Sequence, residues 1–220
     1  MSGTRVPVIA IDGPSASGKG TVAQRVADAL GFHYLDSGAL YRGVALASIR
    51  RGINLDNRLE TSRIALNLNI EFPRDRIVLD GADVSDALRA EDIGAGASRV
   101  AAYPEVRDAL LDRQHAFRQP PGLVADGRDM GSVVFPDAEL KIYLTASAEE
   151  RASRRYKQLM AKGMSASIGA LLQEIRDRDA RDSARAVSPL QKCADAIELD
   201  TTGMSIEAAV AAVLAAYRKA

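Results

Sequence analysis

Apolar residues along the chain form two kinds of pattern, short continuous runs and longer segments in which they recur at helical spacing. The run at residues 6–11 predicts a strand buried on both faces of a parallel sheet. The runs at 123–126 and 140–144 predict further core strands, and those at 32–35 and 196–200 predict a short second strand and a last strand. The longer segments predict helices, at residues 19–30, 37–49, 104–117, 148–161, 168–185 and 205–219. Because strands and helices alternate, we expect an α/β fold in which helices cover both sides of a parallel sheet.

One stretch in the first half of the chain departs from this alternation. Residues 70–72 and 77–79 alternate apolar and polar side chains loosely, and turn-forming residues lie between and after them, at Pro73-Arg74-Asp75 and Asp80-Gly81. This pattern predicts a small antiparallel hairpin. The hairpin would be an insertion between two α/β units.

Composition and charge limit the classes of protein that the chain can represent. Apolar residues make up 47% and charged residues 26%, which argues against disorder. Lys plus Arg and Asp plus Glu number 29 each, so no global basic field would attract nucleic acid or an anionic membrane. One cysteine, Cys193, excludes an intrachain disulfide, and no apolar run is long enough to span a membrane. We therefore expect a cytoplasmic protein without nucleic-acid or membrane partners.

A glycine-bounded loop follows the first predicted strand and opens the first predicted helix. Its residues Gly13, Pro14, Ser15, Ala16, Ser17, Gly18 and Lys19 fit the pattern G-x-x-x-x-G-K, which in this context predicts a P-loop. Such a loop turns successive backbone N–H groups towards phosphate, and the helix N-terminus adds partial positive charge. Lys19 can reach the outer phosphates of a nucleoside triphosphate and offset charge during phosphoryl transfer.

The end of the loop departs from the usual Lys-Ser/Thr pair. Lys19 is followed by Gly20 and then Thr21, so the hydroxyl that commonly binds Mg²⁺ is displaced by one position. This ending favours a nucleoside monophosphate kinase over a GTPase, and the chain has no Asn-Lys-x-Asp motif for reading guanine. Phosphoryl transfer requires Mg²⁺ with ATP, although no Ser/Thr ligand follows Lys19 directly.

Arginines are placed where a second phosphate could bind. A kinase whose acceptor is itself a phosphate must hold two polyanions together, and guanidinium groups grip phosphate with two hydrogen bonds. Arg42 lies early in a predicted helix, whereas Arg128 and Asp129 follow a buried strand. Ligands bind at the carboxyl ends of parallel strands, so Arg128 and Asp129 are expected to face the site.

Two polar helices in the second half of the chain are also rich in arginine. Arg178, Asp182 and Arg185 share one face of the second helix, and the first helix carries a cluster at Arg151, Arg154 and Arg155. The pattern also fits a solvent-facing helix pair with ion pairs between neighbouring turns. Together with a P-loop, it favours a lid that closes over the triphosphate and excludes water.

These motifs together resemble the bacterial cytidylate kinase family, whose members phosphorylate CMP and dCMP. The resemblance runs from end to end and rests on residues 11–14 with 17–21, 36–38 with 41–42, 125–131, and 178–187. It implies a three-layer P-loop kinase fold with a central parallel sheet, an inserted acceptor-binding subdomain and a helical lid. The core would comprise residues 1–62, 106–147 and 190–220, the insertion 63–105, and the lid with its following helix 148–189.

The resemblance also implies a role for each matching residue. Ser98, Arg107 and Asp129 would read the cytosine ring, and Arg178 with Asp182 would contact the sugar. The acceptor phosphate would be held by Arg42, Arg128 and Arg185, with Ser37 nearby. Arg154 and Arg155 would approach the transferring phosphate from the lid. The expected partners are the small molecules ATP and CMP or dCMP, and a monomer is the default expectation.

Two other readings remain open from the sequence. One is another small-molecule P-loop kinase, acting on UMP, AMP, shikimate or a sugar. The other is a nucleotide-dependent regulatory protein that hydrolyses ATP slowly. A nucleic-acid-binding module is weaker, because net charge is zero and aromatic residues are scarce.

Overall fold

The computed structural model describes residues 5–73, 76–161 and 163–220. The chain divides into two compact units, one formed by the residues up to Leu35 together with Phe117–Ala220, and the other by Asp36–Ala116. The expected insertion, residues 63–105, lies inside the second unit. This unit begins before the insertion, at Asp36, and ends after it, at Ala116. The expected turns at residues 73–75 and 162–165 each include positions outside the described residues.

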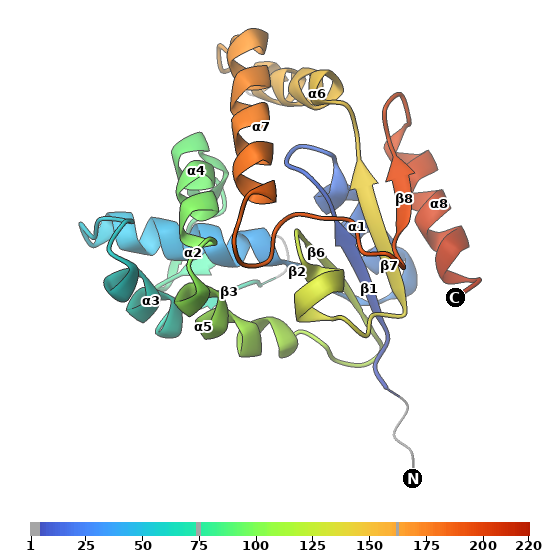
Figure 1. Ribbon diagram of the computed structural model, residues 1–220, viewed down its shortest axis with the longest axis horizontal. Coiled ribbons are helices and arrows are strands. Elements are labelled where there is room, and N and C mark those ends of the chain that lie inside the picture. The colour runs from blue at the N-terminus through green and yellow to red at the C-terminus, as the bar shows by residue number, and fades with distance from the viewer. Residues whose placement is uncertain (1–4, 74–75, 162) are drawn as a thin grey trace. The chain divides into compact units, whose positions relative to one another are not determined.

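The first unit is built on a five-stranded sheet with the order β2-β6-β1-β7-β8. Its strands are β1 (Val8–Asp12), β2 (His33–Asp36), β6 (Leu123–Gly127), β7 (Leu140–Thr145) and β8 (Ile197–Asp200). Strand β1 pairs in parallel with β6 and β7, and β7 with β8. Every residue of β1 and β6 is buried. This includes the apolar runs, as expected for a strand covered on both faces, and also Asp12 and Asp126, which follow those runs. The predicted α/β fold with a central parallel sheet is confirmed (Figure 1).

Two helices of the first unit pack on this sheet. Helix α1 (Lys19–Leu30) ends at Gly31, whose left-handed backbone (φ 66°) suits glycine. Helix α8 (Ile206–Tyr217) is capped by Ser205, which accepts a hydrogen bond from the Ala208 amide, as predicted. Val22, Val26 and Val213 join strand residues in one apolar cluster. This packing fixes the start of α1, and with it the preceding loop, against β1.

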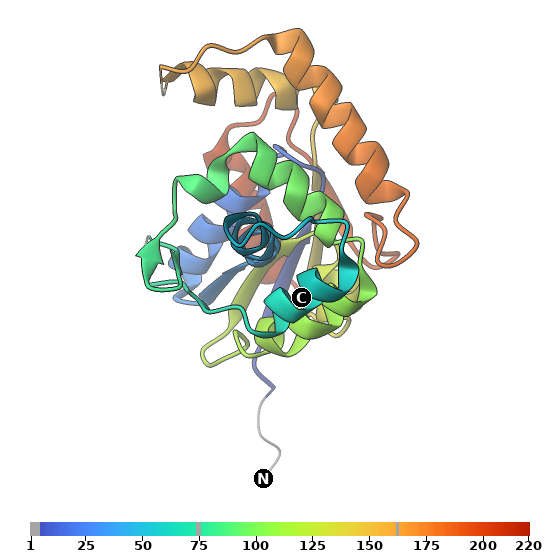
Figure 2. The same ribbon diagram turned by 90° about the vertical axis from the view of Figure 1, so that its left-hand side faces the viewer.

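Two longer helices and a π-helical turn complete the first unit. Helices α6 (Ala148–Ala161) and α7 (Ile168–Ser183) pack together through Ala152, Leu171 and Ile175. In Figure 2 the axes of α6 and α7 point in clearly different directions. The π-helical turn η2 (Met130–Val134) follows β6 and returns the chain towards β7. Both predicted polar helices are confirmed.

The second unit contains four helices and a small sheet among its described residues. The helices are α2 (Ser37–Arg50), α3 (Arg58–Leu66), α4 (Glu91–Val100) and α5 (Pro104–His115), with the short 3₁₀ turn η1 (Ala87–Arg89). The sheet has the order β3-β4-β5, from β3 (Ile70–Glu71), β4 (Val78–Leu79) and β5 (Ala82–Asp83). The predicted hairpin is confirmed by the antiparallel pairing of β3 with β4, and β5 extends it.

Helices α3 and α4 were not predicted from the sequence. Helix α4 contains Gly94 and Gly96, which lower helix propensity. A Cβ on Gly96 would lie 2.9 Å from Leu55 Cδ1 and 3.2 Å from Ala45 Cβ, so a small residue is needed for α4 to approach α2. Gly96, one of the two glycines that obscure this helix in the sequence, therefore allows α4 to pack on α2.

Candidate active site

The P-loop, residues 13–21, leaves the end of β1 and enters α1 as the sequence predicts. A Cβ on Gly13 would lie 2.0 Å from the carbonyl oxygen of Leu144, so no larger residue fits there. Gly18 has a φ of 90°, which only glycine adopts readily, and Ala16 has a positive φ of 58°. The loop is therefore held in a conformation that most side chains would prevent.

Lys19 lies at the base of this loop and is largely buried, with 9% of its surface exposed. Its Nζ donates to the Pro14 carbonyl at 3.2 Å and lies 3.9 Å from Asp126 Oδ1. The Tyr34 hydroxyl donates to the other oxygen of Asp126 at 3.1 Å. The ammonium group is thus held between the loop and a buried carboxylate of β6.

Asp126 also accounts for the unusual glycine after Lys19. A Cβ on Gly20 would lie 3.0 Å from Asp126 Oδ2, so the carboxylate occupies the space beside the position where other P-loops carry a hydroxyl. Thr21 is exposed on α1. Within the described part of the chain no three acidic, His or Cys residues gather into a metal-binding group. The oxygen donors here suit a magnesium ion that keeps most of its ligands from phosphate and water.

Asp12, the last residue of β1, is a buried acid that the sequence did not single out. Its two carboxylate oxygens accept hydrogen bonds from the amides of Met130 and Gly131, both at 2.8 Å. Burial raises the pKa of Asp12 to about 7, against the opposing effect of these two bonds, and the charges of Asp129 and Asp126 raise it further. Asp12 thus ties the strand before the P-loop to the turn after Asp129.

Three arginines, Arg128, Arg178 and Arg185, surround Asp182, and we call these four residues together the arginine cluster. Arg128 Nε donates to Asp182 Oδ2 at 2.9 Å, and Arg185 donates to the other oxygen. The Asp182 side chain is only 1% exposed. Burial by itself would raise the pKa of Asp182, but the charges of Arg128, Arg185 and Arg178 lower it below its ordinary value. The carboxylate therefore stays ionised and holds the arginines together.

The three arginines of α6 differ in their surroundings. Arg151 is 5% exposed and Arg154 is half-buried, and both donate to P-loop carbonyls, from Arg151 Nη1 to Ser15 at 3.1 Å and from Arg154 Nη1 to Ser17 at 3.0 Å. Arg151 also pairs with Asp179 of α7, an arrangement that the sequence did not predict. Arg155 is half-buried. In the sequence, Arg151 could have been found from its place on the same helix face as Arg154 and Arg155.

Four of the predicted residues belong to the second unit: Ser37, Arg42, Ser98 and Arg107. Ser37 is buried at the first position of α2, where Asp36 caps the helix, and Arg42 Nη1 lies 3.6 Å from Asp36 Oδ2. Arg107 is 7% exposed, and its guanidinium lies over the ring of Tyr41 at 5.7 Å. Ser98 is buried on α4. Arg107 Nη1 also donates to the Ala101 carbonyl at 3.3 Å, as a buried charged group requires.

Asp129 belongs to the first unit and stands directly before the turn η2. It is 3% exposed, and its carbonyl accepts from the Val133 amide at 2.9 Å. The structure places Arg128, from the strand end, beside Arg178, Asp182 and Arg185 of one helix face, all in one unit. The sequence predicted the shared helix face but assigned Arg128 to the core and the other three to the lid and its following helix. The assignment of any of these residues to a ligand stays a prediction.

Comparisons with known proteins identify the relatives of this chain. A family model described as cytidylate kinase matches residues 9–219. A cytidylate kinase from Nitrosomonas europaea is 59% identical over 220 residues, which cover 100% of this chain and 99% of that protein. One from Chromobacterium violaceum is 61% identical over 209 residues, covering 95% of this chain and 94% of that protein.

Solved structures add a likeness in fold. A gluconokinase from Sinorhizobium meliloti aligns with a TM-score of 0.51 at 15% identity, over 97% of this chain and 92% of that one. In the described residues no helix has the length and apolar character needed to cross a membrane. The sequence match, which spans nearly the whole chain, decides the relationship: the chain belongs to the cytidylate kinase family.

Proposed function

We propose that the protein transfers the γ-phosphoryl group of ATP to CMP or dCMP, giving ADP and CDP or dCDP. The observation that carries this proposal is the arginine cluster held by the buried, ionised Asp182 in the same compact unit as the P-loop. A P-loop alone serves many reactions. A second set of guanidinium groups is what an acceptor that carries its own phosphate requires.

On the donor side, the P-loop amides would bind the β- and γ-phosphates of ATP, and Lys19 would offset the charge that develops between them. Asp126 beside Gly20 would hold the magnesium ion that accompanies ATP, directly or through water, and the ion would supply positive charge to the donor phosphates. Arg154 and Arg155 would approach the transferring phosphate. For Arg154 this would require exchange of its present hydrogen bonds to Ser17 and Thr201.

On the acceptor side, Arg42, Arg128 and Arg185 would hold the phosphate of CMP, with Ser37 nearby. An oxygen of this phosphate attacks the γ-phosphorus while the bond to the leaving ADP oxygen breaks. The acceptor is already anionic at neutral pH, so the reaction needs positioning and charge stabilisation more than a general base. This agrees with the many arginines and the few isolated histidines of the chain.

The base and sugar would be read by the remaining predicted residues. Asp129 can accept a hydrogen bond from the exocyclic amine of cytosine, and Ser98 and Arg107 can satisfy its other polar atoms. Arg178 and Asp182 would contact the sugar. We expect the protein to work as a monomer with magnesium and these two small-molecule substrates.

A coupled assay of ADP formation with CMP, dCMP, UMP and AMP as acceptors tests the proposal. We expect CMP and dCMP to be the best substrates, and a rate with UMP at least equal to that with CMP would refute the base-reading assignment. ATP turnover that proceeds without any acceptor, unchanged by CMP, would favour a slow regulatory ATPase. Arg107→Ala and Asp129→Ala should impair the use of CMP far more than the binding of ATP.

A further inference from the structure

The P-loop can bind phosphate only if its amides point inward, and this turns its carbonyl groups outward. An outward carbonyl has lost the partner that a regular strand or helix supplies, so it needs another donor. The Pro14 carbonyl accepts from Lys19 Nζ at 3.2 Å, and the Gly18 carbonyl accepts from the Val22 amide at 3.1 Å. The Ser15 carbonyl accepts from Arg151 of α6, and the Ser17 carbonyl accepts from Arg154 of α6 and, at 3.4 Å, from the Thr201 hydroxyl.

These two carbonyls flank the strained residue of the loop. Ala16 lies between them with a φ of 58°, a conformation that residues with a side chain rarely adopt and that persists only when the surroundings impose it. A guanidinium on each side of Ala16 supplies that constraint. Arg154 Nη1 donates to Ser17, and Arg151 Nη1 donates to Ser15 at 3.1 Å.

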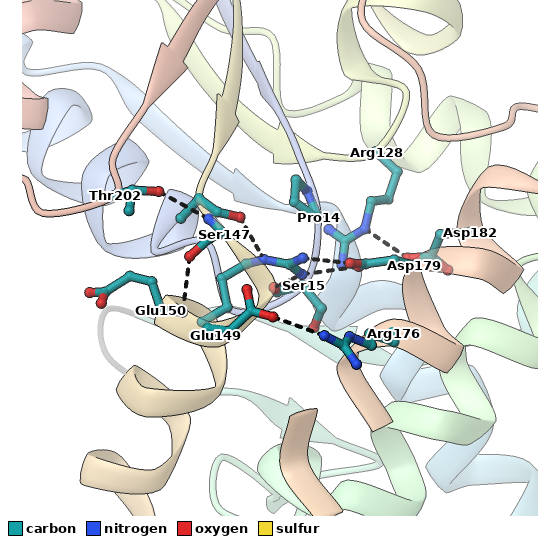
Figure 3. A network of polar contacts seen from close by, with 12 residues as sticks. Pro14, Ser15, Arg128, Ser147, Glu149, Glu150, Arg176, Asp179, Asp182 and Thr202 are labelled. Carbon is teal, nitrogen blue, oxygen red and sulfur yellow. Dashed lines mark hydrogen bonds and ion pairs between the residues drawn. The ribbon is translucent and has the colours of Figure 1, made fainter. Parts of the chain in front are cut away.

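Arg151 is itself fixed from three sides. Its Nε donates to the Ala146 carbonyl at the end of β7 at 3.0 Å. Its two terminal nitrogens form a bidentate pair with Asp179 of α7, at 3.1 and 2.6 Å. The Arg151 side chain is 6% exposed, so these bonds form with little competition from water. Figure 3 shows Asp179 of α7 and Ser15 of the P-loop lying close together.

We propose that Arg151 is a positioning residue for phosphoryl transfer, which holds the Ser15 carbonyl so that the P-loop keeps its phosphate-binding conformation before ATP arrives. Asp179 keeps the guanidinium in place. Arginine suits this role because its planar fork can serve Ser15, Ala146 and Asp179 at once, which a lysine ammonium cannot do in the same geometry. The inference deepens the proposed function, and it rests on that function only in that the P-loop binds triphosphate.

The central test is Arg151→Lys, with binding measured by calorimetry in the absence of turnover. Inorganic tripolyphosphate is the main probe, because it has no base or sugar and reports on the loop alone, and ATP and CMP are measured separately. We expect the dissociation constants of tripolyphosphate and ATP to rise about tenfold, the scale of one lost charge-assisted hydrogen bond. The dissociation constant of CMP should stay the same.

A second variant tests rescue of the loop. Ala16→Gly, placed in the Arg151→Lys background, removes the backbone penalty at the strained position, since glycine adopts a positive φ without cost. Part of the lost tripolyphosphate affinity should return. A purely structural role for Arg151 in helix packing would not respond to this change in the loop.

The chain offers a matched control in Arg176. Arg176 Nη2 donates to Glu149 Oε1 at 2.8 Å and so also joins α7 to α6. This pair is exposed, and among the described residues no hydrogen bond or ion pair joins it to the P-loop. Arg176→Gln should leave tripolyphosphate binding unchanged, whereas Asp179→Asn should weaken it in the same direction as Arg151→Lys and by less. If Arg151→Lys fails to fold, the contrast between Asp179→Asn and Arg176→Gln decides the matter.

Three results would overturn the inference. The first is a folded Arg151→Lys protein that binds tripolyphosphate as well as the wild type. The second is an equal loss of CMP and tripolyphosphate binding, and the third is an equal effect of Asp179→Asn and Arg176→Gln. Failure of the proposed function would look different: the wild-type protein would bind tripolyphosphate and ATP but phosphorylate no nucleoside monophosphate.

Discussion

The P-loop and the arginine cluster lie in the same compact unit but are built in different ways. The P-loop is one continuous run whose shape depends on missing side chains at Gly13 and Gly18 and on donors for its carbonyls. The arginine cluster joins Arg128 to Asp182, residues that are 54 positions apart, through a buried carboxylate. The first is therefore controlled by backbone sterics, and the second by the balance of buried charge. Substitutions should separate the two.

The largest effect is expected on the P-loop side. Lys19→Met removes the cation that offsets phosphate charge in the transition state, and we expect kcat to fall by about 10²–10³-fold. The binding of CMP should change little, because Lys19 contacts Pro14 of the P-loop and Asp126 beside it, on the donor side of the site. Steady-state kinetics with calorimetric titration of CMP checks this. A comparable loss of CMP binding would mean that the two regions are not separable.

Asp182→Asn should affect the opposite side. Removal of one partner from a buried ion pair costs about 3–5 kcal/mol, so we expect the free energy of unfolding at neutral pH to fall by roughly 3 kcal/mol. We also expect kcat/KM for CMP to fall about tenfold or more. Tripolyphosphate binding should persist. Glu149→Gln, which breaks an exposed pair with Arg176, is the control and should cost less than about 1 kcal/mol.

The same residue predicts an acid dependence of stability. Because the arginines lower the pKa of Asp182 in the folded protein, its ion pairs stabilise the fold above the ordinary value of 3.8 and are lost as pH falls through the lower folded value. The stability difference between the wild type and Asp182→Asn, measured by urea unfolding, should therefore shrink in acid. A difference that stays constant down to acid-induced unfolding would contradict the assigned charge state.

Asp12 joins the strand before the P-loop to the turn after Asp129, and the stability that depends on it should respond to pH in the opposite direction. Burial raises the pKa of Asp12 to about 7, so the folded protein binds a proton that the unfolded chain releases near pH 3.8. The stabilisation from this raised pKa is fully present below the unfolded value and is lost as pH rises through about 7. Compared with Asp12→Asn, the wild type should lose stability over this range. Urea unfolding at several pH values measures the difference, and a flat difference would refute it.

The smallest effect is expected from Tyr34→Phe. The Tyr34 hydroxyl donates to Asp126 at 3.1 Å beside Lys19, and the loss of one such bond costs about 1 kcal/mol of stability. The rate should fall less than with Lys19→Met, since the salt bridge of Lys19 to Asp126 remains. A loss of activity as large as that of Lys19→Met would show that Tyr34 contributes more than support for the carboxylate.

Much of the fold could be read from the sequence where the signal is local. Strand β1 appears as an unbroken apolar run and is buried along its whole length, and the glycines of the P-loop follow it directly. Helix α4 was missed because Gly94 and Gly96 argue against a helix, and it is stabilised by close packing on α2 instead. Its existence depends on a neighbour, which no local pattern reports.

The candidate site divides in the same way. The P-loop and the shared face of Arg178, Asp182 and Arg185 follow from spacing alone. The hydrogen bonds from the Met130 and Gly131 amides to Asp12, in contrast, join residues that are 118 and 119 positions apart in the sequence. A buried aspartate at the end of a strand looks in the sequence like any other.

The sequence by itself determined the parallel sheet, the phosphate-binding loop and the wealth of arginine around it. Only the tertiary structure decided what each arginine does: Arg128 and Arg185 meet Asp182, whereas Arg151 meets the Ser15 carbonyl and Asp179. The physical reason is the distance along the chain over which each effect acts. Backbone sterics and periodic burial act over a few residues and leave a pattern, but the partner of a charged side chain is chosen by contacts between distant segments.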